Sequence, residues 1–210
     1  SVLELGCGAG VASLCLGWRV PDLRITGLER QSEHADLARH NAAINGIALR
    51  VVTGDLARMP ADLRGESFDH VIANPPYFLG GTEAPDTARA RARHEETPLT
   101  LWIDAGLRRL CPGGTLTLIQ RADRLDAIIA ALAGRAGGLA ILPVAARAGR
   151  AAGRVIVTAR KRARSPLRLL APFVMHDSPR HEADREDLGT AARRVLRQGD
   201  ALTILFAKVP

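Results

Sequence analysis

Short apolar runs alternate along the chain with longer stretches in which apolar residues recur every three or four positions. The short runs are typical of buried strands, and the longer stretches are typical of amphipathic helices. This alternation predicts an α/β protein with a mostly parallel sheet and helices on both of its faces. The expected strands are residues 2–5, 23–28, 48–52, 68–73, 115–120, 140–146, 154–161 and 201–207. The expected helices are residues 11–18, 32–45, 98–110, 126–133 and 186–197.

The same pattern predicts one domain. With 210 residues and 47% hydrophobic content, the chain is large enough to bury a full α/β core, and it contains no internal repeat or low-complexity linker. We therefore expect residues 1–210 to form a single domain on which residues 162–210 pack as a C-terminal extension. Ser1 stands directly before the first strand, so we also expect the chain to be truncated at its N-terminus.

The tetrapeptide Asn74-Pro75-Pro76-Tyr77 directly follows the apolar run of residues 68–73. Open α/β folds bind ligands at the carboxyl ends of their strands, so this tetrapeptide is expected at a binding edge. The two prolines cannot continue a strand ladder, and we expect their carbonyl groups to face the ligand together with the Asn74 amide. These acceptors favour methylation of a planar amino nitrogen, with the amphipathic Tyr77 ring beside them. A strand-ending turn without further function is the alternative interpretation.

A glycine-rich turn, Gly6-Cys7-Gly8-Ala9-Gly10, follows the first expected strand, which contains Glu4. Glycines at alternate positions let the backbone approach a ligand closely. The dinucleotide fingerprint needs glycine where Val11 stands, so we expect packing against a nucleoside and an amino-acid tail instead of a pyrophosphate. A glycine-rich turn without a ligand is the alternative.

Two acids stand at the ends of the next expected strands. Glu29 lies nineteen residues after Gly10, where a carboxylate can accept hydrogen bonds from both ribose hydroxyls. Asp55 follows the strand at 48–52 and is a candidate acceptor for an adenine amino group, with Leu56 against the ring. As single residues, acids in such positions are more often solvated loop residues or helix caps. Their joint occurrence at consecutive strand ends is what indicates a ligand site.

The net charge of +7 comes from one part of the chain. Residues 127–176 carry nine basic residues and no acid, so the remainder has a net charge of −2. Clustered arginines neutralise phosphates, and a structured nucleic acid such as tRNA is the expected partner. An arginine-rich solvated surface is the alternative. The expected substrate-binding residues are Arg160, Lys161, Arg162 and Arg164 in this segment, and Arg89, Arg91 and Arg93 after the tetrapeptide.

Membrane and metal sites are not expected. No apolar run approaches the ~20 residues needed to span a bilayer and no signal peptide is visible, so we expect a cytoplasmic protein without membrane contact. The three cysteines lack metal-ligand spacing, and the six histidines are scattered. The sequence does not indicate an oligomeric state.

The residues from Glu4 to Gly10, together with Glu29, Asp55 and the Asn74–Tyr77 tetrapeptide, resemble the motifs of class I S-adenosylmethionine-dependent methyltransferases. The resemblance covers about residues 1–160. It implies a Rossmann-like fold whose mostly parallel, seven-stranded sheet ends in an antiparallel C-terminal hairpin. It implies the cofactor S-adenosyl-L-methionine, bound by Glu4, Gly6, Gly8, Gly10, Glu29, Asp55, Leu56 and Asn74. It also implies a catalytic motif of Asn74, Pro75, Pro76 and Tyr77, with Tyr77 and Phe78 contacting the substrate.

Within this superfamily, residues 74–81 and the tail at 166–176 are similar to the bacterial tRNA(Val) adenine-N6 methyltransferase family. That similarity implies methylation of the N6 amino group of an adenine in tRNA. A glutamine N5-methyltransferase acting on a protein such as a release factor, or a guanine-N2 rRNA methyltransferase, would use the same motif on another planar amino group. A non-catalytic RNA-binding module is a further alternative, whereas Val11 and the tetrapeptide disfavour a nicotinamide oxidoreductase.

Overall fold

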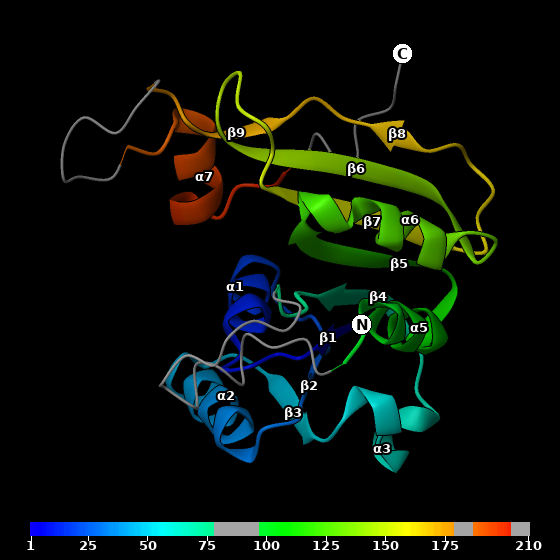
Figure 1. Ribbon diagram of the computed structural model, residues 1–210. Coiled ribbons are helices and arrows are strands. Elements are labelled where there is room, and N and C mark those ends of the chain that lie inside the picture. The colour runs from blue at the N-terminus through cyan, green and yellow to red at the C-terminus, as the bar shows by residue number, and fades with distance from the viewer. Residues whose placement is uncertain (78–96, 179–186, 203–210) are drawn as a thin grey trace, which may run out of the picture.

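A nine-stranded sheet with helices packed against it forms the fold (Figure 1). The computed structural model describes residues 1–77, 97–178 and 187–202. Its strands are β1 (Val2–Leu5), β2 (Ile25–Glu29), β3 (Leu49–Thr53), β4 (Phe68–Ala73), β5 (Leu110–Arg121), β6 (Ala136–Arg147), β7 (Arg154–Lys161), β8 (Arg168–Leu169) and β9 (Phe173–His176). Its helices are α1 (Val11–Arg19), α2 (Ser32–Ile44), α3 (Ala61–Arg64), α5 (Leu99–Arg109), α6 (Leu125–Leu132) and α7 (Thr190–Gln198), with 3₁₀ turns at Leu56–Arg58 and Ala122–Arg124.

The sheet combines a parallel half with an antiparallel hairpin. Parallel strands follow one another in the order β3-β2-β1-β4-β5, and β7 then pairs antiparallel with both β5 and β6. β8 and β9 pair parallel with β6. The expected α/β class is confirmed, and within the described residues the sheet has nine strands where the resemblance implied seven. The added strands contain only two and four residues, which is too short for a hydrophobic period to show in the sequence.

Successive side chains of β1 point to opposite faces of the sheet, and different helices cover each face. Glu4 faces α1, where its carboxylate binds Ser13. Leu5 faces α5, where it lies close to Gly106. Because α1 contacts α2 and α5 contacts α6, one helix pair covers each face of the sheet, as the sequence predicts (Figure 1).

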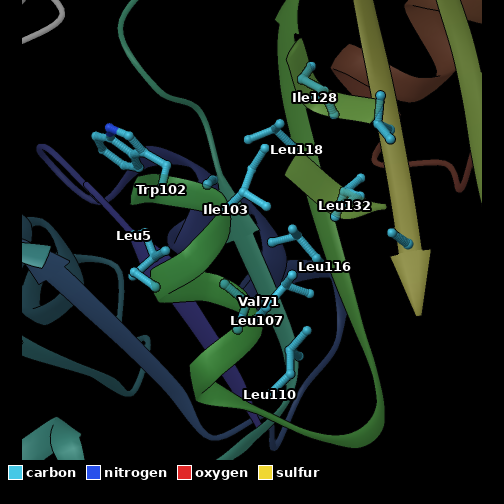
Figure 2. Close-up of a cluster of buried hydrophobic side chains, with 14 of the residues drawn as sticks. Leu5, Val71, Trp102, Ile103, Leu107, Leu110, Leu116, Leu118, Ile128 and Leu132 are labelled. Atoms are coloured by element: carbon cyan, nitrogen blue, oxygen red, sulfur yellow. The ribbon is translucent and has the colours of Figure 1, made fainter. Parts of the chain in front are cut away.

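A hydrophobic core cluster includes side chains of α5, α6 and the strands β4 and β5 (Figure 2). Val71 of β4, Ile103 of α5 and Ile128 of α6 have no exposed surface in this cluster. Each fully buried aliphatic side chain of this kind stabilises the fold by about 1.5–3 kcal/mol. The packing holds β4 firmly, and therefore also the tetrapeptide that follows its last residue.

The start of β5 differs from its expected position. The helix at 98–110 is present as α5, but the strand begins at Leu110 instead of Thr115. Gly113 has a φ of 78°, and a Cβ at Gly114 would lie 2.9 Å from the Asp69 carbonyl oxygen. The glycines therefore form an irregular strand start that approaches β4 closely, where the sequence suggested a connecting loop.

The described part of the C-terminal extension is attached to β6. The strands β8 and β9 pair with β6, and α7 contacts β9. Asp187, which stands before α7, lies 2.7 Å from Arg147 Nη2 through Oδ2 and 2.7 Å from His176 Nδ1 through Oδ1. The expected helix at 186–197 begins only at Thr190, and most of the expected strand at 201–207 lies outside the described residues.

Candidate functional site

Parallel strands end at a common edge of the sheet, which we refer to as the carboxyl edge. Gly6 follows β1, Glu29 ends β2, Asp55 follows β3 and Asn74 follows β4. Open α/β sheets bind their ligands at this edge. The structure therefore places the four groups of residues singled out in the sequence along one side of the molecule.

The three glycines of the turn after β1 have positive φ angles of 66°, 53° and 85°. A Cβ at Gly6 would lie 2.6 Å from the Trp102 ring, and one at Gly10 would lie 3.3 Å from the Ala38 Cβ. These two glycines are needed for the turn to pack against α5 and α2. A Cβ at Gly8 would meet no atom of the described residues within 4 Å. Gly8 is therefore the position at which the backbone is open to a ligand.

Glu29 is 7% exposed, and its carboxylate holds the glycine turn. Its Oε2 accepts a hydrogen bond from the Gly8 backbone N–H at 2.9 Å, and its Oε1 accepts from the Gln31 N–H at 2.9 Å. The Gly54 N–H donates to the Glu29 carbonyl at 2.8 Å, which connects the ends of β2 and β3. Each carboxylate oxygen can accept two hydrogen bonds, so Glu29 keeps capacity for ligand hydroxyls.

Glu4 is a buried carboxyl group on the face of β1 covered by α1. Its Oε2 accepts hydrogen bonds from the Ser13 N–H at 3.0 Å and from the Ser13 hydroxyl at 2.5 Å. Burial raises the pKa of Glu4 from 4.5 to about 7, and the charge of Glu29 adds to this, while the Ser13 hydrogen bonds act in the opposite direction. Glu4 thus fixes the first turn of α1 behind the glycine turn.

Asp55 caps the 3₁₀ turn that follows β3. Its Oδ1 accepts a hydrogen bond from the Ala57 N–H at 2.8 Å. A helix cap was the alternative interpretation of this acid, and the structure shows that Asp55 does act as one. Leu56 packs against the edge of the hydrophobic cluster. The contacts of both residues with an adenine ring stay a prediction.

Asn74 and Tyr77 contact each other within the tetrapeptide. The Tyr77 hydroxyl donates a hydrogen bond to Asn74 Oδ1 at 2.6 Å. The Arg154 guanidinium carbon lies 5.3 Å from the centroid of the Tyr77 ring. Sequence reasoning placed Arg154 in the basic segment but not in the site, because nothing local indicates which strand lies beside β5.

Gln120 is a site residue that sequence reasoning missed. It is 1% exposed near the end of β5, and its Nε2 lies 3.5 Å from the Pro75 carbonyl oxygen and 3.4 Å from that of Pro76. Its Oε1 accepts a hydrogen bond from the Arg121 N–H at 2.8 Å. The available signal was a polar residue at the carboxyl end of an otherwise apolar strand.

The basic segment is divided between two edges of the sheet. Because β7 is antiparallel to β5, Arg154 pairs with Arg121 at the carboxyl edge, whereas Arg160 pairs with Thr115 at the opposite edge. Six residues of strand separate the two arginines, which corresponds to about 20 Å. The structure therefore does not bring Arg160, Lys161, Arg162 and Arg164 together with the tetrapeptide.

Two of these four residues bind the protein itself. Lys161 Nζ donates to the Leu110 carbonyl at 2.5 Å, and burial lowers the pKa of Lys161. Arg160 Nε donates to the Gly113 carbonyl at 3.4 Å. Arg162 and Arg164 are exposed, and substrate binding by this group stays a prediction. Phe78, Arg89, Arg91 and Arg93 lie outside the described residues.

Membrane-spanning helices and metal-ligand clusters are both absent from residues 1–77, 97–178 and 187–202. No helix in these ranges is both long and apolar enough to cross a bilayer. The same ranges contain no group of three or more His, Cys, Asp or Glu residues arranged to hold a metal ion.

The glycine turn, the acid at the end of β2 and the acceptor motif at the end of β4 define a Rossmann-like class I methyltransferase fold. The chain belongs to the methyltransferase small domain family, whose sequence profile matches residues 1–127. The expected superfamily is thereby confirmed.

Two curated relatives carry the same name. The tRNA1(Val) (adenine(37)-N6)-methyltransferase of Porphyromonas gingivalis is 38% identical over 128 residues, which are 59% of this chain and 50% of that protein. The enzyme of this name from Shewanella baltica is 35% identical over 137 residues, or 62% of this chain and 57% of that protein. The chain therefore spans about half the length of the curated relatives it matches.

Solved structures of methyltransferases share the fold. A protein from Agrobacterium tumefaciens, named a predicted O-methyltransferase, is 30% identical with a TM-score of 0.73, covering 92% of this chain and 86% of its own. The Thermus thermophilus 16S rRNA N2 G1207 methyltransferase, solved with AdoMet and guanosine, has a TM-score of 0.54 at 20% identity, covering 77% of this chain and 37% of its own. The second similarity supports the fold alone.

Proposed function

We propose that this chain is the catalytic domain of an S-adenosylmethionine-dependent N-methyltransferase that methylates the N6 amino group of an adenine in tRNA. The observation that carries the proposal is the cluster of Asn74, Pro75, Pro76 and Tyr77 at the carboxyl edge, directly after the strand that pairs with β1, from which the glycine turn follows. The curated relatives named above support tRNA as the substrate class. A tRNA substrate is also consistent with the expected cytoplasmic location.

The residues at the first three strand ends fit S-adenosylmethionine. The turn leaves free space at Gly8, where a Cβ would meet no described atom within 4 Å, and the nearly buried carboxylate of Glu29 is available to ribose hydroxyls. When bound, this cofactor supplies an electrophilic methyl group on a sulfonium. We assign its binding to Glu4, Gly6, Gly8, Gly10, Glu29, Asp55, Leu56 and Asn74.

The acceptor residues would act on the amino group of the base. An adenine N6 lone pair is delocalised into the ring, so the nitrogen is a poor nucleophile until hydrogen-bond acceptors hold its protons and favour a pyramidal geometry. Asn74 Oδ1 and the Pro75 carbonyl are the acceptors available at the end of β4. They would contribute positioning and electrostatic stabilisation in an in-line displacement.

No general base is required for this reaction. Transfer of the methyl group gives a positively charged, four-substituted nitrogen, whose N–H proton is strongly acidic and can leave to water after the transfer. Tyr77 would stack on the base, which must leave its own stack to reach the site, and we assign Phe78 to the same pocket. The basic residues Arg89, Arg91, Arg93, Arg160, Lys161, Arg162 and Arg164 would bind RNA phosphates.

The test is transfer of a labelled methyl group from S-adenosylmethionine into unmodified tRNA and, in parallel, into total protein, followed by nucleoside analysis. N6-methyladenosine in tRNA is expected. Asn74→Ala should lower kcat by roughly 10²-fold or more, because the transition state loses an acceptor, while cofactor binding measured by calorimetry persists.

The matched control is Asn45→Ala, an exposed asparagine at the end of α2 whose replacement should leave kcat unchanged. Unchanged transfer by Asn74→Ala would overturn the role assigned to this side chain.

The alternatives give different products in the same assay. A glutamine N5-methyltransferase would label protein, and a guanine-N2 enzyme would produce N2-methylguanosine. Labelled hydroxyl groups would agree with the name of the Agrobacterium relative and would contradict the interpretation of the tetrapeptide. A non-catalytic RNA-binding module would bind tRNA without transferring any label.

A further inference from the structure

Arg154 is the basic residue that the structure brings into contact with the tetrapeptide. It is exposed at the start of β7, and its guanidinium carbon lies 5.3 Å from the Tyr77 ring centroid. A cation within about 6 Å of an aromatic ring centroid, over the ring face, is attracted by the ring quadrupole. Arg154 therefore covers one face of Tyr77.

The ring is also fixed at its polar end. The Tyr77 hydroxyl donates to Asn74 Oδ1 at 2.6 Å, so the phenol is held by a hydrogen bond at one end and by a cation over one face. A ring held at two points loses less conformational freedom when a base stacks on it.

We propose that Arg154 is a positioning residue of the methyl-transfer site, which holds the Tyr77 ring so that the substrate base stacks on the opposite face. This inference rests on the proposed function, because it assumes that Tyr77 receives an adenine. Arg154 acts through Tyr77 and touches neither the transferred methyl group nor the accepting nitrogen.

The hairpin supplies a matched control. Arg150 is an exposed arginine in the turn between β6 and β7, four residues before Arg154. Among the described residues, no contact between Arg150 and the Tyr77 ring is present. Arg150→Ala and Arg154→Ala remove the same charge from neighbouring parts of the molecule. A contribution to general phosphate attraction would affect both variants alike, whereas positioning of the ring would affect Arg154→Ala alone.

The kinetic test is a double-mutant cycle on tRNA methylation. Arg154→Ala should raise KM for tRNA by about 2- to 5-fold with little change in kcat, the range expected for an exposed cation–π contact. The effect should persist in a Tyr77→Phe background, which keeps the ring, and should vanish in a Tyr77→Ala background. Arg154→Lys should recover part of the loss. Equal effects of Arg154→Ala with and without the ring would overturn the proposal.

A second readout does not depend on activity. Tyr77 is the single tyrosine of the chain, so protein labelled with 3-fluorotyrosine gives one ¹⁹F resonance. Arg154→Ala should shift this resonance and Arg150→Ala should leave it in place. An unmoved resonance in Arg154→Ala, or equal shifts in both variants, would also overturn the proposal. If the wild type fails to methylate tRNA, the proposed function is wrong, and the resonance alone decides whether Arg154 holds the ring.

Discussion

Gln120 shows how a single residue outside a motif shapes it. The polar groups of Pro75 and Pro76 are their backbone carbonyls. The Gln120 side-chain amide lies within 3.5 Å of both carbonyl oxygens. The same side chain accepts a hydrogen bond from the Arg121 N–H, so it connects β5 to the loop after β4. Because Gln120 is 1% exposed, water cannot readily replace it.

Replacement of Gln120 by leucine should therefore damage both stability and catalysis. The partly buried Arg121 N–H and the proline carbonyls would lose their partner, at a cost of about 1–3 kcal/mol in the free energy of unfolding. We expect kcat to fall while cofactor affinity persists. Urea unfolding and tRNA methylation measure the two effects, with Gln198→Leu at the exposed end of α7 as the control. Equal stability of both variants would show that Gln120 is not a structural link.

Glu4 predicts a pH-dependent stability. Its folded pKa of about 7 lies above the ordinary 4.5, so between these values the folded state binds more protons than the unfolded state. The free energy of unfolding should therefore fall as pH rises through this window, by about 3 kcal/mol in total. Glu4→Gln keeps an acceptor for Ser13 but cannot titrate, so it should exceed the wild type in stability at pH 8. Denaturant unfolding at pH 5 and pH 8 tests this, and a constant difference between the two proteins would contradict it.

The sequence predicted the chemical role of these positions better than it predicted which residues they contact. The alternating glycines were recognised as a close-approach turn, but only the structure shows that Gly6 makes room for Trp102 and that Gly8 is the open position. Likewise, Asp55 was recognised at a strand end, and its capping of the next turn was one of two interpretations. Local sequence specifies side-chain type, whereas the partner depends on packing between distant segments.

At the scale of elements, the direction of β7 separates two arginines that the sequence groups together. The sequence predicted the hairpin of residues 140–146 and 154–161, and the hairpin is present as β6 and β7. It did not predict that β7 lies between β5 and β6, because long-range pairing leaves no local pattern. For that reason the sequence did not indicate that Arg154 lies beside Tyr77.

Ionic and polar contacts of Asp187 attach α7 and β9 to β6. Asp187 joins Arg147 of β6 to His176 of β9, and all three side chains are less than a third exposed. Asp187→Ala should leave the Arg147 guanidinium and the His176 ring partly buried without their carboxylate partner, which destabilises the docked elements by about 1–3 kcal/mol. Hydrogen exchange of the β9 amides should accelerate accordingly. The control is Asp200→Ala, which breaks a more exposed pair with Arg194 and should change exchange in β9 little.

At the scale of the whole molecule, the net charge of +7 is expected to govern RNA affinity. Arg160, Arg162 and Arg164 are exposed at the edge opposite the tetrapeptide, where phosphates could reach them. A structured RNA long enough to contact both edges would have to cross about 20 Å of sheet.

Reversal of Arg160, Arg162 and Arg164 to glutamate should therefore weaken tRNA binding and flatten its dependence on salt. The slope of log affinity against log salt concentration should decrease by roughly 0.7–0.9 for each phosphate that the variant no longer neutralises. Fluorescence anisotropy with labelled tRNA at several salt concentrations measures this slope. The same reversal at the exposed Arg19, Arg24 and Arg58, outside the basic segment, should change it less. Equal slopes for the two triple variants would show that the basic segment is an ordinary solvated surface without a specific role in RNA binding.

The fold as a whole was the most predictable level. Strand and helix patterns alternate regularly, and glycine or an acid stands at successive strand ends. All of these signals agree with an α/β fold that has a mostly parallel sheet. The short strands β8 and β9 were not predictable, because two and four residues carry too little pattern to stand out.

The contact between Arg154 and Tyr77 connects the start of the β6–β7 hairpin's second strand to the loop after β4. The glycine turn and Glu29 belong to the first two strands, whereas Arg154 belongs to a hairpin beyond β5. Under the proposed function, an exchange of the turn at residues 148–153, with its flanking arginine, would therefore alter acceptor preference without disturbing β1 and β2. This turn is then the place at which a segment from another protein could be inserted to change which RNA the proposed methyltransferase modifies.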